Sequence, residues 1–423
     1  MPQSNLNLPT KATNPVECLG HQFPSEEARR EHYLKLLAQK LKDPEFRKIE
    51  GFPIGKDEDI LALSDPPYYT ACPNPWLGEF IKCYGTPYDP KQPYHREPFA
   101  ADVSEGKTHP IYTAHSYHTK VPHRAIMRYL LHYTKPGDVV FDMHGQPGGS
   151  QVNRMLSGVF YIASQHSECS PWYNLENKLD RLSETFRQAR PHAHLPLIAT
   201  GSADSRILKD ESLDYVFTDP PFGDNIYYAD MNLMLESWHR VFTQSEPEAI
   251  IDKHKGKGLP EYQARMLRCF QEYFRALKPG RWITVEFSNS EASVWNAIQT
   301  TMQEAGFVVA NVAALDKQQR SFRSVTTTTA VKQDLVISAY KPNGGLEERF
   351  AKRGETEEGV WDFIRTHFKN LPVVKAKGGQ MEFITERDPR ILYDRMVAFY
   401  VGHTHRPVAH LRGRRTQRHQ LAA

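Results

Sequence analysis

The sequence contains no long run of apolar residues free of charges, and its first residues, Met1 to Pro15, lack the basic-then-apolar order of a secretory signal. These two absences argue against a membrane span and against export. We therefore expect a soluble, cytoplasmic protein without a membrane partner. With 423 residues and 39% apolar content, the chain is long enough for one large domain plus a smaller one or extensions.

Cysteine is scarce as well. The chain has five cysteines, an odd number, and none lies close to another in the sequence. This pattern argues against a disulfide framework and against a zinc ribbon. The chain has 19 histidines, but the pairs His115 with His118 and His403 with His405 lack acids or cysteines at metal-ligand spacing. We interpret the histidines as loop or surface residues and predict no metal.

A large excess of positive charge is also missing. Lys and Arg number 53 against 50 for Asp and Glu, a net charge of +3, which excludes a globally basic nucleic-acid binder. Local basic clusters stand out instead, and any of them could neutralise the phosphates of DNA. They are Lys253, Lys255 and Lys257, then Arg320 and Arg323, and an arginine-rich tail from His403 to Ala423 without any acid. The alternative for each is a charged solvated face or, for the tail, a disordered segment.

The most informative segment runs from Ser212 to Phe222. It is an apolar strand that ends in Asp219-Pro220-Pro221-Phe222, and no packed core requires that ending. The acid offers a carboxylate, Pro220 offers a carbonyl on a chain stiffened by Pro221, and the aromatic ring offers a flat face. These groups fit an exocyclic amine on an aromatic base. Hydrogen bonds from both N–H groups would localise the delocalised lone pair of that amine and aim it at a methyl donor, while the ring stacks on the flipped base.

A similar sequence, Asp65-Pro66-Pro67-Tyr68, lies earlier in the chain. We expect only one of the two to be the catalytic site. Three strand-helix units of about 30 residues each would not fit between Tyr68 and His115. The interval after Phe222, in contrast, supplies all the later strands. We therefore predict that Asp219, and not Asp65, carries catalysis.

Upstream of Asp219, the chain has the pattern of a nucleotide-type first strand. A short apolar stretch ends at Asp142 and is followed by Gly145 and Gly148, which let the backbone approach a ligand. We expect this loop to contribute to a cofactor site.

Two further apolar strands lead to acids. Val159–Ala163 leads to Glu168, in the position that holds ribose hydroxyls, and Leu195–Ala199 leads to Asp204, which could accept a hydrogen bond from an adenine amine. Ligands of an open α/β sheet gather at the carboxyl ends of its strands, so we expect these acids to converge with Asp219. The alternative for each acid alone is a helix cap or a turn.

The order of glycine loop, acid, acid and Asp-Pro-Pro-aromatic resembles the S-adenosylmethionine-dependent DNA amino-methyltransferases. An Asp before Pro-Pro is similar to their adenine-N6 branch more than to the cytosine-N4 branch. The segment His115–Pro122 resembles the family's stretch ahead of the first strand, and the family implies contacts there, including Lys120, to the methionine end of the cofactor. The loop departs from Asp-x-Phe-x-Gly-x-Gly, because His144 replaces the aromatic residue and Gly145 comes one place early.

The resemblance implies methyl transfer from S-adenosylmethionine to a base amine in DNA, adenine N6, as in restriction-modification enzymes. Two alternatives stay open. The first is the same chemistry on RNA or on a protein amide, because the tetrapeptide recognises a planar amine rather than a polymer. The second is a catalytically inactive nucleic-acid-binding homologue, which the altered glycine loop suggests.

The resemblance also implies a fold: a Rossmann-like class I methyltransferase with a mostly parallel sheet and an antiparallel last strand. We expect an N-terminal extension at residues 1–110, the methyltransferase domain at 111–342 and a small helical C-terminal unit at 343–423. Further predictions are later strands at 281–287, 306–309 and 334–340, helices at 25–42, 360–368 and 390–400, and irregular structure at 73–108.

Overall fold

The computed structural model describes residues 15–92, 94–107, 109–114, 121–144, 170–188, 196–224, 227–289, 291–316, 334–343, 346, 349, 357–372, 375–377, 380–382 and 384–404. The chain divides into two compact units. The first comprises residues 1–86, 192–208 and 232–247, and the second comprises 87–191, 209–231 and 248–423. The domain boundaries expected at 110 and 342 stay predictions.

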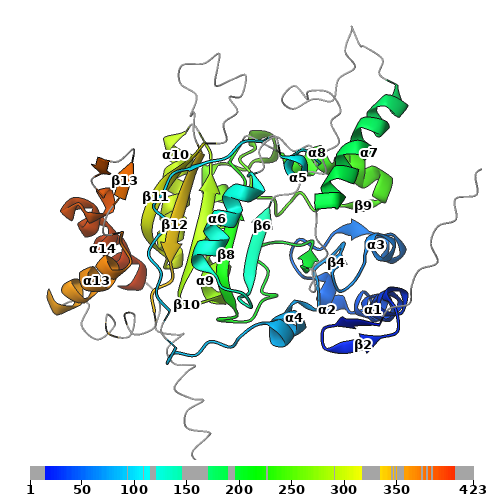
Figure 1. Cartoon of the computed structure of the whole chain (residues 1–423), viewed down its shortest axis with the longest axis horizontal. Helices are drawn as coiled ribbons and strands as arrows, with labels where there is room; N and C mark the ends of the chain where they lie inside the picture. The colour runs from blue at the N-terminus through cyan, green and yellow to red at the C-terminus, as the bar shows by residue number, and fades with distance from the viewer. Residues whose placement is uncertain are drawn as a thin grey trace, which may run out of the picture. The chain divides into compact units, whose positions relative to one another are not determined.

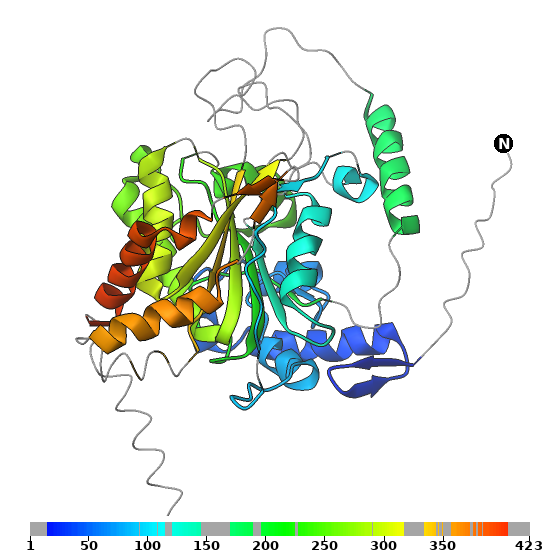
Figure 2. The same cartoon turned by 60° about the vertical axis from the view of Figure 1, so that its left-hand side comes forward.

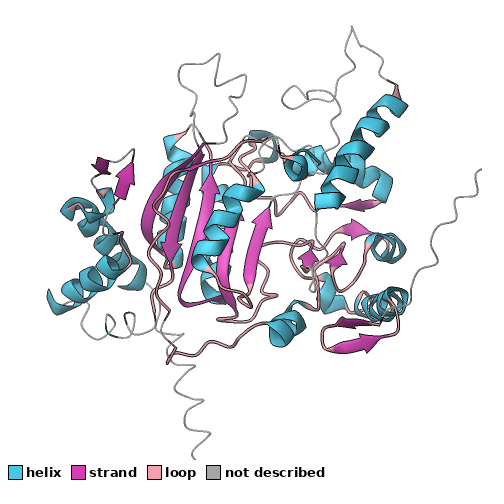
Figure 3. Cartoon of the chain, in the orientation of Figure 1, coloured by secondary structure: helices cyan, strands magenta, loops and turns pink. Residues whose placement is uncertain are grey.

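The second unit is built around a six-stranded sheet in the order β5-β11-β12-β10-β8-β6 (Figures 1 and 3). Its strands are β5 (Val103–Ser104), β6 (Val140–His144), β8 (Leu213–Asp219), β10 (Leu277–Phe287), β11 (Val308–Asp316) and β12 (Asp334–Tyr340). Strands β6, β8 and β10 are parallel neighbours, whereas β12 pairs antiparallel with both β10 and β11. The last strand of the sheet is therefore antiparallel and inserted between earlier strands. This arrangement confirms the predicted Rossmann-like class I methyltransferase fold.

Strand β8 is buried along its whole length, as expected of a central parallel strand that is covered on both faces. On one face lies α6 (His123–Tyr133), where Tyr133 stacks on Tyr215 of β8 with ring centroids 5.2 Å apart and on Trp282 of β10 at 5.0 Å. On the other face lies α9 (Leu259–Ala276), whose Tyr273 packs against Phe141 of β6. Because side chains alternate along a strand, these contacts fix which residues face α6.

The other helices of the second unit are α5 (Pro110–Ala114), α7 (Pro171–Gln188), α10 (Ala292–Ala305), α13 (Glu357–Lys369) and α14 (Pro389–Thr404), with a short hairpin of β13 (Lys375–Lys377) and β14 (Gln380–Glu382). The helices predicted near 360–368 and 390–400 are thus present. Phe363, Leu392 and Phe399 share one hydrophobic core with strand residues of the sheet, so these C-terminal helices pack onto it (Figure 2).

The first unit contains α1 (Glu26–Lys40), α2 (Pro44–Arg47), α3 (Asp57–Leu63), α4 (Leu77–Tyr84) and the strand pairs β1 (Val16–Cys18) with β2 (His21–Phe23), β3 (Ile54–Gly55) with β9 (Val241–Phe242), and β4 (Tyr69–Thr70) with β7 (Ile198–Ala199). Helix α8 (Tyr228–His239) contributes residues to both units. The predicted N-terminal helix is confirmed, since Ser25 caps α1 by accepting a hydrogen bond from the amide of Ala28 at 3.2 Å.

Two sequence predictions need correction. The segment 73–108 is not wholly irregular, because it contains α4 and β5. The third strand expected at 195–199 shrinks to Ile198–Ala199 and pairs with β4 rather than with the main sheet. The reason is local: the amide of Ile198 donates to the carbonyl of Tyr68 at 2.7 Å, and its carbonyl accepts from Asn74.

The strand predicted at 159–163 lies outside the described residues. In the part of the chain that the structure describes, no helix is long and apolar enough to cross a membrane.

Candidate active site

Asp219 is the last residue of β8, at the carboxyl end of the sheet. It lies between two parallel strands, opposite His144 of β6 on one side and one residue beyond the pair formed by Thr218 with Val285 of β10 on the other. The residue is buried, with 9% of its surface exposed. A carboxylate at this edge occupies the position where ligands of open α/β sheets bind.

The loop after Asp219 is held in place by three hydrogen bonds to its backbone carbonyls. Tyr262 of α9 donates its hydroxyl to Pro221 at 2.6 Å, Asn289 donates its amide to Phe222 at 2.8 Å, and the backbone N–H of Ile251 donates to Gly223 at 3.2 Å. Gly223 has a φ of 78°, in the left-handed region that favours glycine. A Cβ atom there would lie 3.4 Å from the Asn289 amide nitrogen. The loop is therefore a fixed turn.

The carbonyl of Pro220 differs from these three. No donor among the described residues is bound to it, although Pro220 itself is buried. Asp219 and Pro220 thus offer a carboxylate and a carbonyl acceptor at adjacent positions, on a turn whose following carbonyls are already bonded. Such a pair can accept both N–H groups of one planar amine.

Phe222, the residue predicted to stack on the base, is buried in the structure. It is 6% exposed and packs edge-on against Phe287 of β10, with centroids 5.2 Å apart and ring planes at 88°. The ring is largely shielded from solvent in this arrangement, so stacking on a base would require it to become exposed. Tyr227, five residues later, is half-buried. Burial first, and then the nearby acids Asp252, Asp224 and Asp230, raise the pKa of its phenol.

The predicted cofactor residues are described only in part. Asp142 lies on β6, exposed, and pairs with Phe217 two residues before Asp219. Its carboxylate suits the hydroxyl or ammonium groups of a cofactor such as S-adenosylmethionine. Asp204 falls in the first unit, so its convergence with Asp219 stays a prediction. Lys120, Gly145, Gly148 and Glu168 lie outside the described residues.

The earlier Asp-Pro-Pro-Tyr sequence is occupied by a side chain of the same chain. Arg29 of α1, 3% exposed, donates from Nη2 to Oδ1 of Asp65 at 2.9 Å and from Nη1 to the carbonyl of Pro66 at 2.5 Å. Its guanidinium carbon lies 4.6 Å from the centroid of the Tyr68 ring. The carboxylate, the carbonyl and the ring thus all contact one planar N–H donor of the same chain.

The lysine cluster lies on a tight loop attached to the turn at Asp219. Residues Lys253–Lys255 form a short 3-10 helix capped by Asp252, and the neighbouring Ile251 bonds to Gly223. Lys253 is exposed, Lys255 pairs with Asp230 at 3.2 Å, and Lys257 donates to the carbonyl of Glu248 at 3.0 Å. Arg320 and Arg323 lie outside the described residues.

Sequence reasoning missed the residues that hold the turn, Tyr262 and Asn289, and a buried acid of β10, Glu286. For Glu286 a signal is present, since it is the only charged residue in the apolar run Trp282–Phe287. No local sequence pattern identifies Tyr262 or Asn289 as residues that hold the turn.

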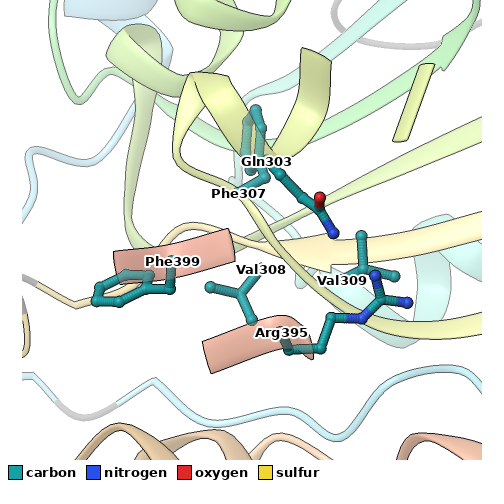
Figure 4. A pocket seen from close by; sticks show the side chains of 6 residues that line it. All are labelled: Gln303, Phe307, Val308, Val309, Arg395 and Phe399. Atoms are coloured by element: carbon teal, nitrogen blue, oxygen red, sulfur yellow. The ribbon is translucent and has the colours of Figure 1, made fainter. Parts of the chain in front are cut away.

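The geometry also bears on two other kinds of site. Among the described residues, no group of three or more His, Cys, Asp or Glu side chains could hold a metal ion. A pocket lies between β11, α10 and α14, lined by Gln303, Phe307, Val308, Val309, Arg395 and Phe399 (Figure 4). Val308 begins β11, which runs parallel to β10, so the pocket lies at the amino end of the sheet, away from Asp219.

No protein-family model matches this chain, and no curated protein matches it in sequence. Among solved structures, it is similar to the [4+2]-cyclase SpnF, with 12% identity and a TM-score of 0.23 over 40% of this chain and 65% of that chain. It is also similar to a protein of Thermus thermophilus assigned as a DNA modification methylase, with 13% identity and a TM-score of 0.22 over 47% and 72% of the two chains.

A third similar structure is a 16S rRNA (adenine(1408)-N(1))-methyltransferase from Catenulisporales acidiphilia, with 15% identity and a TM-score of 0.21 over 38% of this chain and 73% of that one. TM-scores this low do not establish a shared overall structure. The fold of this chain is therefore assigned from its own strand order.

Proposed function

We propose that this protein transfers a methyl group from S-adenosylmethionine to the exocyclic amine of a base in DNA, adenine N6. One observation carries the proposal. At the carboxyl end of β8, the Asp219 carboxylate is followed directly by the Pro220 carbonyl, which accepts no hydrogen bond from any described residue. This edge belongs to a sheet with the strand order of class I methyltransferases.

In this proposal Asp219 and Pro220 each accept one N–H of the amine. The two hydrogen bonds pull the nitrogen lone pair out of conjugation with the ring and fix its direction. Bound S-adenosylmethionine supplies the electrophilic methyl group. Asp142 would hold the cofactor from the neighbouring strand, together with Lys120, Gly145, Gly148, Glu168 and Asp204 from the sequence prediction. Phe222, after rotation, would stack on the base.

The Arg29 contacts support this recognition chemistry. A guanidinium is planar, carries several N–H donors and stacks on aromatic rings, as an aminated base does. Arg29 bonds to the acid and to the first proline carbonyl of Asp65-Pro66-Pro67-Tyr68 and lies over its ring. The same tetrapeptide type can therefore hold a planar N–H donor within this chain.

The partner in the proposal is DNA, bound in part by the lysine loop. Lys253 and Lys255 are exposed on the loop that is bonded to the turn at Gly223, so phosphates that contact them would lie near the amine-binding groups. Arg320 and Arg323 would add to this surface.

Methylation of plasmid DNA by the purified protein with labelled cofactor tests the proposal. We expect labelled DNA from the wild type, a loss of at least about 100-fold in Asp219→Ala, and little change in Asp224→Ala, which removes an exposed acid of the same loop. Parallel reactions with RNA and with a protein substrate separate the alternatives. If RNA or protein is labelled and DNA is not, the substrate is that polymer and not DNA. If calorimetry detects no cofactor binding, the proposed enzyme activity is wrong and the alternative of a catalytically inactive nucleic-acid-binding protein stands.

A further inference from the structure

Asp219 has a second carboxylate beside it on the neighbouring strand. The register of the parallel strands β8 and β10 pairs Thr218 with Val285, and the next residues along the two strands are Asp219 and Glu286. Neighbouring strands lie about 4.8 Å apart, so the two Cβ atoms are about 5 Å apart if both point to the same face.

Both side chains do point to the same face. Tyr215 of β8 and Trp282 of β10 pack on Tyr133 of α6, and the Tyr215 hydroxyl donates to Thr284 at 2.6 Å, so these residues face α6. Asp219 follows Tyr215 by four residues, and Glu286 follows Trp282 by four. Since the side-chain period of a strand is two, both acids face α6 as well.

The two acids are shielded from water. Glu286 is 0% exposed and Asp219 is 9% exposed. From α6, Tyr129 lies 6.2 Å from Phe217 between ring centroids, and its phenol pKa is raised by burial first and then by the charges of Asp102 and Glu286. The Tyr129 hydroxyl is buried and has no hydrogen-bond partner among the described residues. The Glu286 carboxyl is thus buried beside the end of β8, where Asp219 lies.

We propose that Glu286 is a positioning residue for Asp219 and that the two carboxyl groups share one proton. Two buried carboxylates on adjacent strands repel each other, and one retained proton removes that repulsion. The protonated group then donates a hydrogen bond to the other carboxylate. This bond fixes one oxygen of Asp219 and leaves its second oxygen to accept an N–H of the substrate amine. No bond is made or broken by this proton, which stays between the two acids.

The inference rests on the proposed role of Asp219. On the neighbouring strand β6, His144 pairs with Asp219 and Asp142 pairs with Phe217. On the α6 side, the charges that act on Tyr129 are those of Asp102, Glu286 and Arg128. On the other side of β10, Glu286 faces the apolar Val336 of β12. Arg128 of α6 is itself engaged by Glu105 at 2.7 Å.

Two variants at Glu286 test the inference. The amide of Glu286→Gln can still donate a hydrogen bond to Asp219, whereas the side chain of Glu286→Leu cannot. In single-turnover methyl transfer we expect Glu286→Gln to stay within about tenfold of the wild type and Glu286→Leu to lose about 100-fold, with cofactor affinity unchanged in both. The wild-type rate should fall at alkaline pH as the shared proton is lost, and this fall should be absent in Glu286→Gln because an amide does not titrate. Equal losses in the two variants, or an alkaline fall that persists in Glu286→Gln, would overturn the inference.

A measurement without substrate separates this inference from the proposed function. Infrared difference spectroscopy of the free protein at pH 7 should show a protonated carboxyl band in the wild type that is lost in both Glu286→Gln and Asp219→Asn. A wild type that has the band but methylates no polymer would contradict the proposed function and leave the shared proton standing. A wild type without the band would contradict the shared proton whatever the activity.

Discussion

The guanidinium of Arg29 lies where a substrate amine would lie if Asp65 were catalytic, with Nη2 2.9 Å from Oδ1 of Asp65. The chain therefore carries two Asp-Pro-Pro-aromatic sequences whose polar groups are bonded differently. In the first unit, the carboxylate, carbonyl and ring are all engaged by Arg29. In the second unit, the carbonyl of Pro220 has no bonded donor among the described residues. Sequence spacing favours Asp219 as the catalytic acid, and these contacts give that choice a physical reason.

The Arg29 contacts should make that side chain a stability residue of the first unit. Arg29→Ala removes charge-assisted hydrogen bonds to Glu26, Asp65 and the Pro66 carbonyl from a buried position, so we expect a loss of about 2–4 kcal/mol in the free energy of unfolding. The neighbouring Arg30 has a side chain that is 47% exposed, and Arg30→Ala should cost less than about 1 kcal/mol. Urea unfolding of both variants checks the ranking. Similar losses in the two would show that Arg29 has no special role.

The turn after Asp219 should matter for rate more than for cofactor affinity. Tyr262→Phe removes only the hydroxyl that bonds to Pro221, which should cost about 1 kcal/mol of stability. Because the turn sets the direction of the Pro220 carbonyl, we expect the methyl-transfer rate to fall about tenfold with the cofactor dissociation constant unchanged. Tyr273→Phe offers a control on the same helix, one that leaves the turn's hydrogen bonds intact. A Tyr262→Phe enzyme with the wild-type rate would show that the turn does not depend on this bond.

The lysine loop should produce a salt-dependent affinity for duplex DNA. If Lys253, Lys255 and Lys257 bind phosphates, a triple Lys→Gln variant should flatten the slope of log affinity against log salt by nearly one for each phosphate that is no longer neutralised. Lys35, an exposed lysine of the first unit paired with Glu31, gives the matched control in Lys35→Gln. Fluorescence anisotropy over a salt series measures both slopes. A slope unchanged in the triple variant would remove this loop from the DNA surface.

How far the sequence predicts this structure differs from element to element. Strands β8, β10 and β12 were predictable because each is an apolar run bounded by breaking or polar residues. The pairing of Ile198 with the first unit was not, because a two-residue strand carries no periodicity and its partner, Tyr69, lies far away in the sequence. Pairing of short strands depends on which backbone groups are left to bond, and that is a tertiary property.

The candidate site divides in the same way. Asp219 and Pro220 could be proposed from the sequence because their chemistry is local to one tetrapeptide. The burial of Phe222 could not, because it depends on Phe287 at the end of another strand. Likewise, Glu286 becomes a neighbour of Asp219 only through the register of β8 with β10, and a shift of one residue would send its side chain to the other face.

His367 should make the stability of the second unit depend on pH. Its side chain is fully buried in the C-terminal helices, with Nδ1 3.1 Å from the hydroxyl of Tyr340 on β12. Burial first, and then the charge of Arg395, lower the pKa of this imidazole to about 3. The unfolded chain has a histidine pKa near 6.5. Between these two values, the unfolded state binds a proton that the folded state does not bind, so stability is full above about pH 6.5 and falls as the pH drops toward 3.

From pH 7 to pH 5, this one group should remove about 2 kcal/mol from the free energy of unfolding. His367→Phe should be less stable at pH 7, because it loses the bond to Tyr340, but its stability should fall less steeply over that interval. His254→Gln, a change at an exposed histidine, should keep the wild-type slope. Urea unfolding at pH 7, 6 and 5 measures the three slopes. If His367→Phe and the wild type lose equal stability, the buried imidazole is protonated in the folded protein, and the contact with Tyr340 must then be made by a charged ring.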